Sequence, residues 1–468
     1  MCVKESRHGR CSIMSVVDTH DIAAAVAARI DPAGWRAEFE SLFARVAPAF
    51  ARVEPRRRAR LFIQALLGPV EVRTCWQIAE YAGEPDPGGM QRLLASASWD
   101  DAFVRAQIRT YVVAGFGPGG VLIVDETGDA KKGTMTVAVQ DQYTGTLGKI
   151  DNAQVSVHLA YANRTGARAL VDFRLYLPAS WTDNPDRCTA AKVPADIGFA
   201  TKPQLAWQMI EDALDAGVPA AWVAADEVYG NDTRLRARLR TRRIGYVLAI
   251  RADTALTRWD YPNLTITAEK VAAFLPPKMW GRYLAGWGSK GPRYYLWAWV
   301  KIVETETDGT AQGHHWLLLR RNETTGEVAY YRCWSPTPVG LPTLTWTAGL
   351  RWPIESCFQD AKGQTGLDQH QVRTWRSWHR YTTLVLVAAA FLAVLAARQP
   401  RPLPSMLPAT DEIGPLSAAE IRRLLVFVFT KPDTTMRHAL SWLAWRLAHQ
   451  ARARHYHYKR RTLADISQ

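Results

Sequence analysis

The sequence predicts an α/β fold in which a mixed sheet is flanked by helical regions and interrupted by a β-rich insertion. From about residue 116, short apolar segments rich in β-branched residues alternate with helical segments. Before this point and after residue 341, Ala and Leu recur at helical spacing. Between 254 and 340, strand-like segments follow one another without the long helical patterns seen on either side. Strands that alternate with helices after an initial meander indicate a mixed sheet.

Composition indicates a globular protein with an anionic partner. The chain has 468 residues, of which 48% are hydrophobic and 22% charged, and 58 Lys+Arg against 44 Asp+Glu give a net charge of +14. This length allows two to four domains at roughly 100–200 residues each. The positive charge favours a polyanion, with nucleic acid first and an anionic membrane surface second. An acidic solvating protein is excluded, and a small neutral ligand is disfavoured as the main partner.

The cysteines and apolar segments predict a cytoplasmic protein that makes no membrane contact. Six cysteines lie far apart with no CxxC pair, which is typical of free thiols in a reducing compartment. The first residues are charged and lack the apolar core of a signal peptide. The longest apolar segment, 384–397, is shorter than the roughly 20 residues that span a bilayer. We therefore expect it to be a buried core helix.

The N-terminal part is expected to be a flexible segment, 1–19, followed by a helical DNA-binding domain, 20–115. Residues 74–83 and 90–99 form two helical patterns separated by EPDPGG, as in a helix–turn–helix. If this motif reads DNA, Gln91 and Arg92 lie at the start of the recognition helix, where base edges are contacted. An ordinary helical hairpin accounts for the pattern equally well.

The first part of the core is predicted at 116–253. Its apolar segments have the composition of strands, and the expected strands are 121–125, 134–140, 155–163, 219–226 and 244–252. A helix is expected at 203–216, and a short Arg-rich helix precedes the last strand.

The rest of the chain is divided by composition. Residues 254–340 form the β-rich insertion, with strands expected at 294–304, 314–322 and 327–334. The second part of the core, 341–398, is expected to be helical from Thr347 to about Ala397. A Pro-rich linker, 399–416, leads to C-terminal helices and a basic tail at 417–468. Residues 417–420, SAAE, form a capping box that begins the first of these helices.

Three carboxylates are candidates for a metal site. Asp125 and Asp226 each end an apolar strand, and functional groups converge at strand ends in open α/β sheets. Glu355 lies in the first turn of a helix after Pro353, where the helix dipole favours the ionised form. Each acid taken alone is also a common turn or helix-start residue. Glu126 and Glu227 are alternative ligands.

Carboxylates without Cys or His companions suit Mg²⁺ or Mn²⁺ better than zinc. Two such ions about 3.5–4 Å apart activate a water or a 3′-hydroxyl and stabilise the leaving oxygen in phosphoryl transfer. Arg351 and Lys362 flank Glu355 and are expected to hold phosphates.

Several segments resemble the DDE transposases of bacterial insertion sequences. They include VDETGDAKKG, ADEVYG, RWPIESCFQDAKGQTGLDQHQVRTW and the C-terminal HQARARHYHYKRR, and the resemblance runs from about 74 to 461. It is greatest to the clade with a Tyr-Arg-Glu-Lys signature around the final acid. The resemblance implies an RNase H-like catalytic core with a β-rich insertion, and metal ligands at Asp125, Asp226 and Glu355.

The resemblance also assigns phosphate contacts. Arg351 and Lys362 match the Arg and Lys of the signature, whereas Ala348 occupies the position of its Tyr. Asp129 is a second departure, because an aromatic or apolar residue is usual there. The remaining expected phosphate contacts are Lys131, Lys132 and Arg373. Related transposases stack a flipped base on an aromatic residue of the insertion, and Trp280 and Trp287, expected in loops, are the candidates here.

The expected function is that of an insertion-sequence transposase. Such an enzyme binds double-stranded DNA at terminal inverted repeats, cleaves it with Mg²⁺ and joins 3′-OH ends to target DNA. Two Mg²⁺ ions are expected, with Mn²⁺ as a substitute. A homodimer is expected in the synaptic complex, in the bacterial cytoplasm at the nucleoid. Two alternatives stay open: a domesticated DNA-binding regulator, and an RNase H-fold nuclease without strand transfer.

Overall fold

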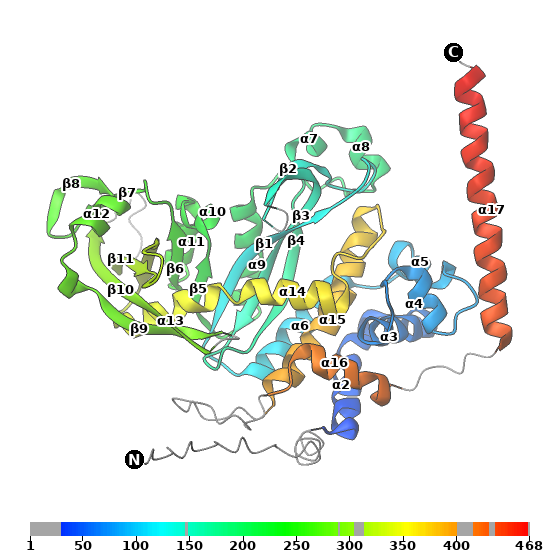
Figure 1. Cartoon of the computed structure of the whole chain (residues 1–468), viewed down its shortest axis with the longest axis horizontal. Helices are drawn as coiled ribbons and strands as arrows, with labels where there is room; N and C mark the ends of the chain where they lie inside the picture. Colours follow the sequence, from blue (N-terminus) through cyan, green and yellow to red (C-terminus); the bar gives the residue numbers. More distant parts are fainter. Residues whose placement is uncertain are drawn as a thin grey trace, which may run out of the picture.

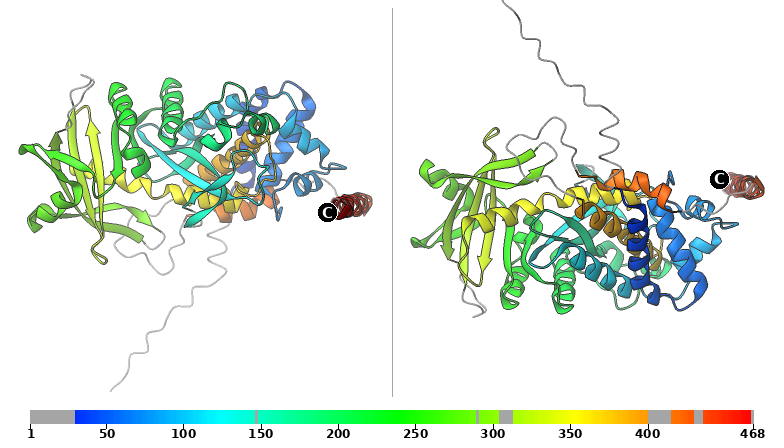
Figure 2. Two further views of the ribbon diagram at one scale, coloured as in Figure 1. Left: turned by 90° about the horizontal axis from the view of Figure 1, so that it is seen from above. Right: turned by 90° about the horizontal axis from the view of Figure 1, so that it is seen from below.

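The computed structural model describes residues 30–145, 148–288, 291–303, 313–399, 415–429 and 436–466. A central sheet lies between a β-rich lobe at one end and the N-terminal helices at the other (Figure 1). The two perpendicular views show the same order of parts along the long axis, with the C-terminal helix beside the N-terminal helices (Figure 2).

The N-terminal region is helical in its described part, as predicted. Its α-helices are α2 (Pro32–Val46), α3 (Val53–Leu67), α4 (Cys75–Tyr81), α5 (Gly88–Ala95) and α6 (Asp101–Phe116). The Thr74 side chain accepts a hydrogen bond from the Gln77 amide and caps α4, which satisfies one of the free amides at the start of the helix. Helices α4 and α5 correspond to the two halves of the predicted helix–turn–helix.

A mixed sheet forms the centre of the molecule and confirms the predicted α/β class. Its strands are β1 (Gly120–Ala130), β2 (Gln140–Thr144), β3 (Lys149–Ala162), β4 (Arg168–Leu175), β5 (Ala220–Ala225) and β6 (Gly245–Ile250). Strand β3 pairs antiparallel with β1 and β4, whereas β5 is parallel to both β1 and β6. The resulting order β4-β3-β1-β5-β6, covered by helices, is consistent with an RNase H-like core.

Two strand predictions in this sheet were wrong. Strand β1 does not end at Asp125 but continues to Ala130, because its second half pairs with β3. Residues 134–139 form bends and turns, and β2 begins only at Gln140. Val137, Ala138 and Val139 are all fully buried, so side chains do not alternate between two faces, and Ala138 has a φ of 64° that no strand residue adopts.

The β-rich insertion extends the central sheet. Its elements are β7 (Ala255–Arg258), β8 (Tyr261–Thr267), α12 (Ala268–Phe274), η2 (Pro277–Met279), β9 (Gly281–Gly288), β10 (Gly291–Val303), β11 (His314–Arg321) and β12 (Val328–Ser335). Strand β12 pairs antiparallel with β6, so core and insertion share one sheet of twelve strands. The domain boundaries at 254 and 341 therefore stay predictions from the sequence.

Trp280 follows η2 in a loop, as expected. Trp287 lies in β9, opposite Pro292, and the prediction of a loop was wrong there. The β9–β10 pairing accounts for the difference. The Trp287 side chain lies outside the described part of the structure.

Helices cover the sheet on both faces. Those inside the first core segment are α7 (Ala179–Thr182), α8 (Pro185–Ala190), α9 (Lys202–Asp215), α10 (Glu227–Gly230) and α11 (Thr233–Thr241). Those after the insertion are α13 (Leu341–Arg351), α14 (Ile354–Thr365) and α15 (Trp375–Ala397). The prediction of one helical stretch from Thr347 was wrong at its start and in its continuity. The helix begins at Leu341, and α14 ends at Gly366, whose φ of 77° suits a glycine after a helix.

Helix α15 is the central core helix that the apolar segment 384–397 predicted. It is the one helix in the described ranges that is long and apolar enough to cross a membrane. In its most apolar window, 78% of the residues are buried inside the protein. Burial against α6, α3 and β4 accounts for its composition.

The C-terminal region contains α16 (Ala418–Val428) and α17 (Met436–Ile466). The capping box of Ser417 and Glu420 is present at the start of α16. Helix α17 contacts α4, because the Trp442 indole donates to the Glu84 carbonyl and Trp445 packs edge-on against Trp76. The linker residues 400–414, and the side chains of the basic tail from 457 onward, lie outside the described part.

Candidate active site

Asp125 and Asp226 are brought together by the parallel pair β1–β5. The last partners of that pair are Val124 and Ala225, and an aspartate follows each of them. Asp226 leaves the sheet at once and caps the short helix α10, where its carboxylate accepts the Val228 amide at 3.0 Å. Asp125 stays in β1 and accepts the Glu126 amide at 2.9 Å. The expected meeting of the two acids is therefore observed.

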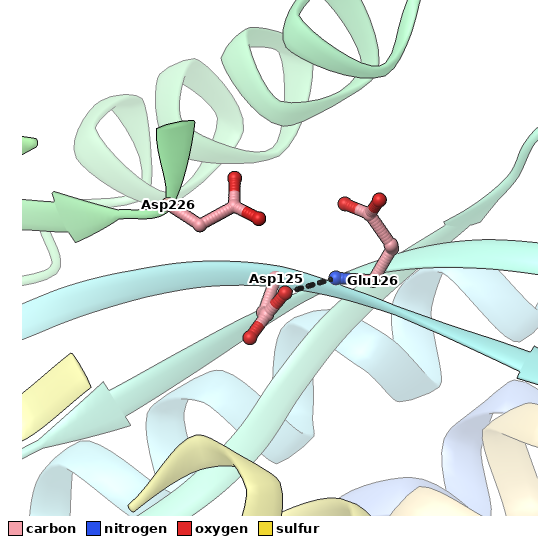
Figure 3. A group of neighbouring side chains, drawn as sticks. All are labelled: Asp125, Glu126 and Asp226. Carbon is pink, nitrogen blue, oxygen red and sulfur yellow. Dashed lines mark hydrogen bonds between the residues drawn. The ribbon is translucent and has the colours of Figure 1, made fainter. Parts of the chain in front are cut away.

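Glu126 is the third acid in this cluster. Each of Asp125, Glu126 and Asp226 offers one carboxylate oxygen, and these oxygens lie within 4.8 Å of one another. The three side chains come from neighbouring positions of β1 and from the end of β5 (Figure 3). This cluster is called the acidic cluster below.

Glu126 has partners of its own. Its Oε1 accepts from the Lys202 ammonium at 2.6 Å, and its Oε2 accepts from the Tyr229 hydroxyl at 2.6 Å. Both partners are supplied by α9 and α10. Nothing in the local sequence around Lys202 or Tyr229 indicated these contacts, which depend on the packing of α9 and α10 beside β1.

The acidic cluster carries more negative charge than its surroundings neutralise. Burial raises the pKa of Asp125 to about 7, with added repulsion from Asp226 and Glu126 and an opposing attraction from Arg351. Burial and repulsion from Glu126 also raise the pKa of Asp226, again opposed by Arg351. Arg351 is thus the cation whose field reaches both aspartates.

Glu355 stands outside the acidic cluster. It lies in the first turn of α14, as predicted, and its side chain is exposed. No hydrogen bond or ion pair joins its carboxylate to another side chain in the described ranges. The structure therefore brings together Asp125 and Asp226 but not Glu355, and Glu126 is the third acid beside the two aspartates.

Lys362 lies beside Gly128, which is three residues beyond Asp125 along β1. Its ammonium donates to the Gly128 carbonyl at 3.1 Å, and burial lowers its pKa. Gly128 and the opposing strand β3 place it close to the buried His158. This position is near the sheet rather than on the open surface.

Asp129 holds two basic groups of this region. It forms an ion pair with Lys131 and lies 3.2 Å from the Nε2 of the buried His370. These contacts hold its pKa below the usual range although burial alone would raise it. Asp129 therefore has a structural role, and Lys131 is engaged by it. Ala348, the other departure from the signature, is buried in α13.

The other predicted phosphate contacts, Lys132 and Arg373, are exposed. Arg373 lies at the edge of a cavity of about 650 Å³ between the helix–turn–helix and the start of α15. Gln91 also lines this cavity, and its neighbour Arg92 is exposed on α5. The lining contains four cations and no acid, and the cations are Arg73, Lys192, Arg373 and Arg376. Arg73, Lys192 and Arg376 were not predicted, since none of the three belongs to a motif.

Of the two candidate tryptophans, the structure describes the side chain of Trp280. The Arg321 guanidinium lies 3.9 Å from the centre of its ring, and its indole nitrogen is buried without a hydrogen-bond partner in the described ranges. It packs against the smaller hydrophobic core of the β-rich lobe.

Comparison with known proteins agrees with this geometry. Residues 45–265 match the family described as DDE superfamily endonuclease, a range that contains Asp125, Glu126 and Asp226. The chain is also 30% identical over 183 residues to a protein of Microchaete diplosiphon described as "Probable transposase for insertion sequence element IS701". That match covers 39% of this chain and 45% of the relative, so the chain spans less than half the length of the curated relative it matches.

The residues of the acidic cluster fit a divalent metal ion. Three carboxylates with oxygens within 4.8 Å of one another form a hard donor set. Burial, with added repulsion from Asp226 and Glu126, raises the pKa of Asp125, and a bound cation would favour its ionised form. The acidic cluster is therefore a candidate metal centre.

Proposed function

We propose that the protein is an insertion-sequence transposase that cleaves DNA with divalent metal ions and transfers 3′-OH ends to target DNA. The observation that carries the proposal is the meeting of Asp125 and Asp226 at the end of the β1–β5 pair, inside the range that matches the DDE superfamily endonucleases, in a chain with a net charge of +14. Partly buried acids in a basic protein are suited to holding metal against DNA phosphates.

Asp125, Asp226 and Glu355 are proposed as the ligands of two Mg²⁺ ions, with Mn²⁺ as a substitute. Bound metal would supply a Lewis acid and an activated hydroxyl for phosphoryl transfer. Glu355 is favoured over Glu126 because Lys202 and Tyr229 already occupy the two oxygens of Glu126, whereas Glu355 is exposed. Glu126 is the alternative third ligand.

The basic groups near the acidic cluster are proposed to position the substrate strand. Arg351 acts on both aspartates and offers a planar donor for a phosphate. Lys131, Lys132, Lys362 and Arg373 are proposed to contribute further along the DNA. Among these, the exposed Lys132 and Arg373 are free of the packing that engages Lys131 and Lys362.

Gln91 and Arg92 are proposed to recognise the terminal inverted repeats. Both are exposed on α5, and the cavity beside Gln91 carries the cations that a DNA backbone requires. A homodimer would pair two transposon ends in the synaptic complex, in the bacterial cytoplasm where the nucleoid lies. Trp280 is proposed as a base-stacking residue with Trp287 as its alternative.

The test uses a plasmid that carries the inverted repeats flanking this gene, together with a labelled repeat-end duplex and a target plasmid. We expect Mg²⁺-dependent cleavage at the ends and capture of labelled ends by the target. Cleavage without capture would indicate a nuclease, and end binding without cleavage would indicate a regulator. Either result would contradict the proposed transposase.

A further inference from the structure

Three arginines converge where the β-rich lobe meets the helix that precedes Glu355. Arg293 lies on β10, Arg320 on β11, and Arg351 at the end of α13. The Cζ atoms of Arg320 and Arg293 lie 3.5 Å and 5.9 Å from the centre of the Trp352 ring, which follows Arg351 in the chain. We call Arg293, Arg320 and Arg351 the arginine cluster.

Within the described part of the chain, the arginine cluster has no carboxylate partner. In the described ranges, none of its three guanidinium groups forms an ion pair or a hydrogen bond. The Nε atoms of all three, and Nη1 of Arg320, are buried without a hydrogen-bond partner in that part of the chain. Other arginines of this lobe are paired: Arg282 binds Glu323, and Arg258 binds Asp260. Unpaired donors in this number require an explanation.

Arg320 is the most costly of the three to leave unpaired. It is only 5% exposed and lies between Trp352 and Tyr295, whose ring centre is 4.7 Å from its Cζ. Burial lowers its pKa, Tyr331, Tyr295 and the Glu327 charge oppose that shift, and the charge of Arg351 adds to it. Burial raises the pKa of the neighbouring Tyr331, and Arg320 and Arg351 both oppose that rise. Two like charges therefore act on the same region, and in the described ranges no carboxylate forms an ion pair with either of them.

The packing of the lobe on α13 places the arginine cluster at Arg351, the member whose charge acts on the acidic cluster. Gly349 lies so close to β9 that a Cβ atom would be 1.7 Å from the Ala285 carbonyl oxygen. This contact places the β9–β10 hairpin beside Arg351, whose charge also acts on Asp125 and Asp226. An anion at the arginine cluster would thus lie next to the candidate metal centre.

We propose that Arg320 and Arg293 of the β-rich lobe complete, with Arg351, a binding site for a backbone phosphate of the DNA strand held at the acidic cluster. Guanidinium groups donate to phosphate oxygens in a planar, bidentate manner, and Trp352 and Tyr295 hold the Arg320 plane in place. The inference rests on the proposed function in that DNA is the substrate. It assigns Arg320 and Arg293 as positioning residues for the strand.

The test measures binding of a fluorescein-labelled DNA duplex by the full chain in EDTA, over a range of salt concentrations. We expect Arg320→Met to weaken binding roughly tenfold and to make the slope of log K against log salt less steep by about 0.9, the value for one phosphate contact. Its melting temperature should be unchanged or higher, because an unpaired buried charge is removed. A purely structural arginine would give a lower melting temperature and an unchanged slope.

Arg282→Met is the matched control. Arg282 lies in the same lobe and over a tyrosine ring, at 4.2 Å from Tyr294, but it is paired with Glu323. We expect its slope to equal that of the wild type. If Arg320→Met fails to fold, Arg293→Gln decides instead, since Arg293 is less buried.

An unchanged affinity and slope in folded Arg320→Met, or in Arg293→Gln, would overturn the inference even if the wild type cleaves DNA. A wild type that shows the expected slopes but never cleaves repeat-bearing plasmid in Mg²⁺ would contradict the proposed function alone. The two proposals therefore fail by different measurements.

Discussion

Asp125 and Asp226 occupy equivalent positions, each one residue beyond the last partners of the parallel pair β1–β5. The backbone of the sheet therefore fixes the starting points of both side chains. Asp226 then turns into α10, whereas Asp125 continues in β1. Because the sheet sets this geometry, replacing either carboxylate leaves the strand pairing intact, and replacing Asp226 removes only the side-chain cap of the short helix α10.

Asp125→Ala and Asp226→Ala should each reduce metal-dependent cleavage of repeat-bearing plasmid by about 10³-fold or more, since each removes a proposed metal ligand. DNA binding in EDTA should be retained, because a negative charge is lost and no cation is changed. Asp253→Ala is the control, since Asp253 is an exposed acid paired with Arg251. Full cleavage by either variant of the acidic cluster would exclude the proposed site.

Glu355 and Glu126 give different expectations as the third ligand. Glu355→Gln should abolish cleavage and leave the melting temperature nearly unchanged, because the side chain is exposed and has no described partner. Glu126→Gln should lower stability by about 1–3 kcal/mol, since the buried hydroxyl of Tyr229 and the ammonium of Lys202 lose a charged acceptor.

Cleavage assays and thermal unfolding of both variants separate the two roles. Glu355→Ala should match Glu355→Gln in activity, because the charge is what the metal requires. If Glu355→Gln cleaves at the wild-type rate while Glu126→Gln is folded and inactive, Glu126 is the ligand and the assignment from the resemblance is wrong.

DNA binding should depend steeply on salt, and the cavity beside Gln91 should account for part of that dependence. Arg373→Gln and Arg376→Gln, which remove two of the cations lining it, should each make the slope of log K against log salt less steep by about 0.9. Arg57→Gln is the control, because Arg57 is paired with the buried Glu84. A flat salt response of the wild type would contradict DNA as the partner.

The sequence predicted the elements whose burial or hydrogen bonding is visible in the local pattern of residue types. Residues 121–124 and 222–225 are apolar because β1 and β5 are buried on both faces, and the composition of α15 follows from its burial. The capping box at Ser417 was also predictable, since its two hydrogen bonds are local. The positions of Asp125 and Asp226 followed from these strands.

Features fixed by distant parts of the chain were missed. The segment 134–139 looks like a strand, but its backbone is held by the Arg373 carbonyl and by the Gln154 side chain. The partners of Glu126 come from α9 and α10, and the unpaired state of Arg320 becomes visible only once β11 packs against Trp352. No local pattern in the sequence encodes such contacts.

The space around two helical glycines differs, because α13 packs closely on β9 at Gly349 whereas Gly363 in α14 has open space beside it. Substitution by alanine should therefore have opposite effects at the two positions. Gly349→Ala should lower the free energy of unfolding by about 1–3 kcal/mol, because the new Cβ would lie 1.7 Å from the Ala285 carbonyl oxygen. Gly363→Ala, inside α14, should raise it by about 0.5–1 kcal/mol, since nothing lies within 4 Å of its Cβ position. Urea unfolding measures both, and equal effects of the two substitutions would contradict the close approach.

The buried His158 predicts a loss of stability in acid. Burial, with a smaller effect of the Lys362 charge, lowers the pKa of His158 to about 3 in the folded protein. The unfolded chain takes up this proton below about pH 6.5, so the stabilisation is complete above that pH and declines toward about pH 3, by about 1.4 kcal/mol per pH unit.

His158→Phe keeps a ring beside Phe173 and Phe358 but cannot titrate. Urea unfolding between about pH 6.5 and 4.5 should show a slope smaller by that amount in the variant. The buried His370 and His379 remain in both proteins and set the residual slope. Identical slopes would mean that His158 is not held neutral by the fold.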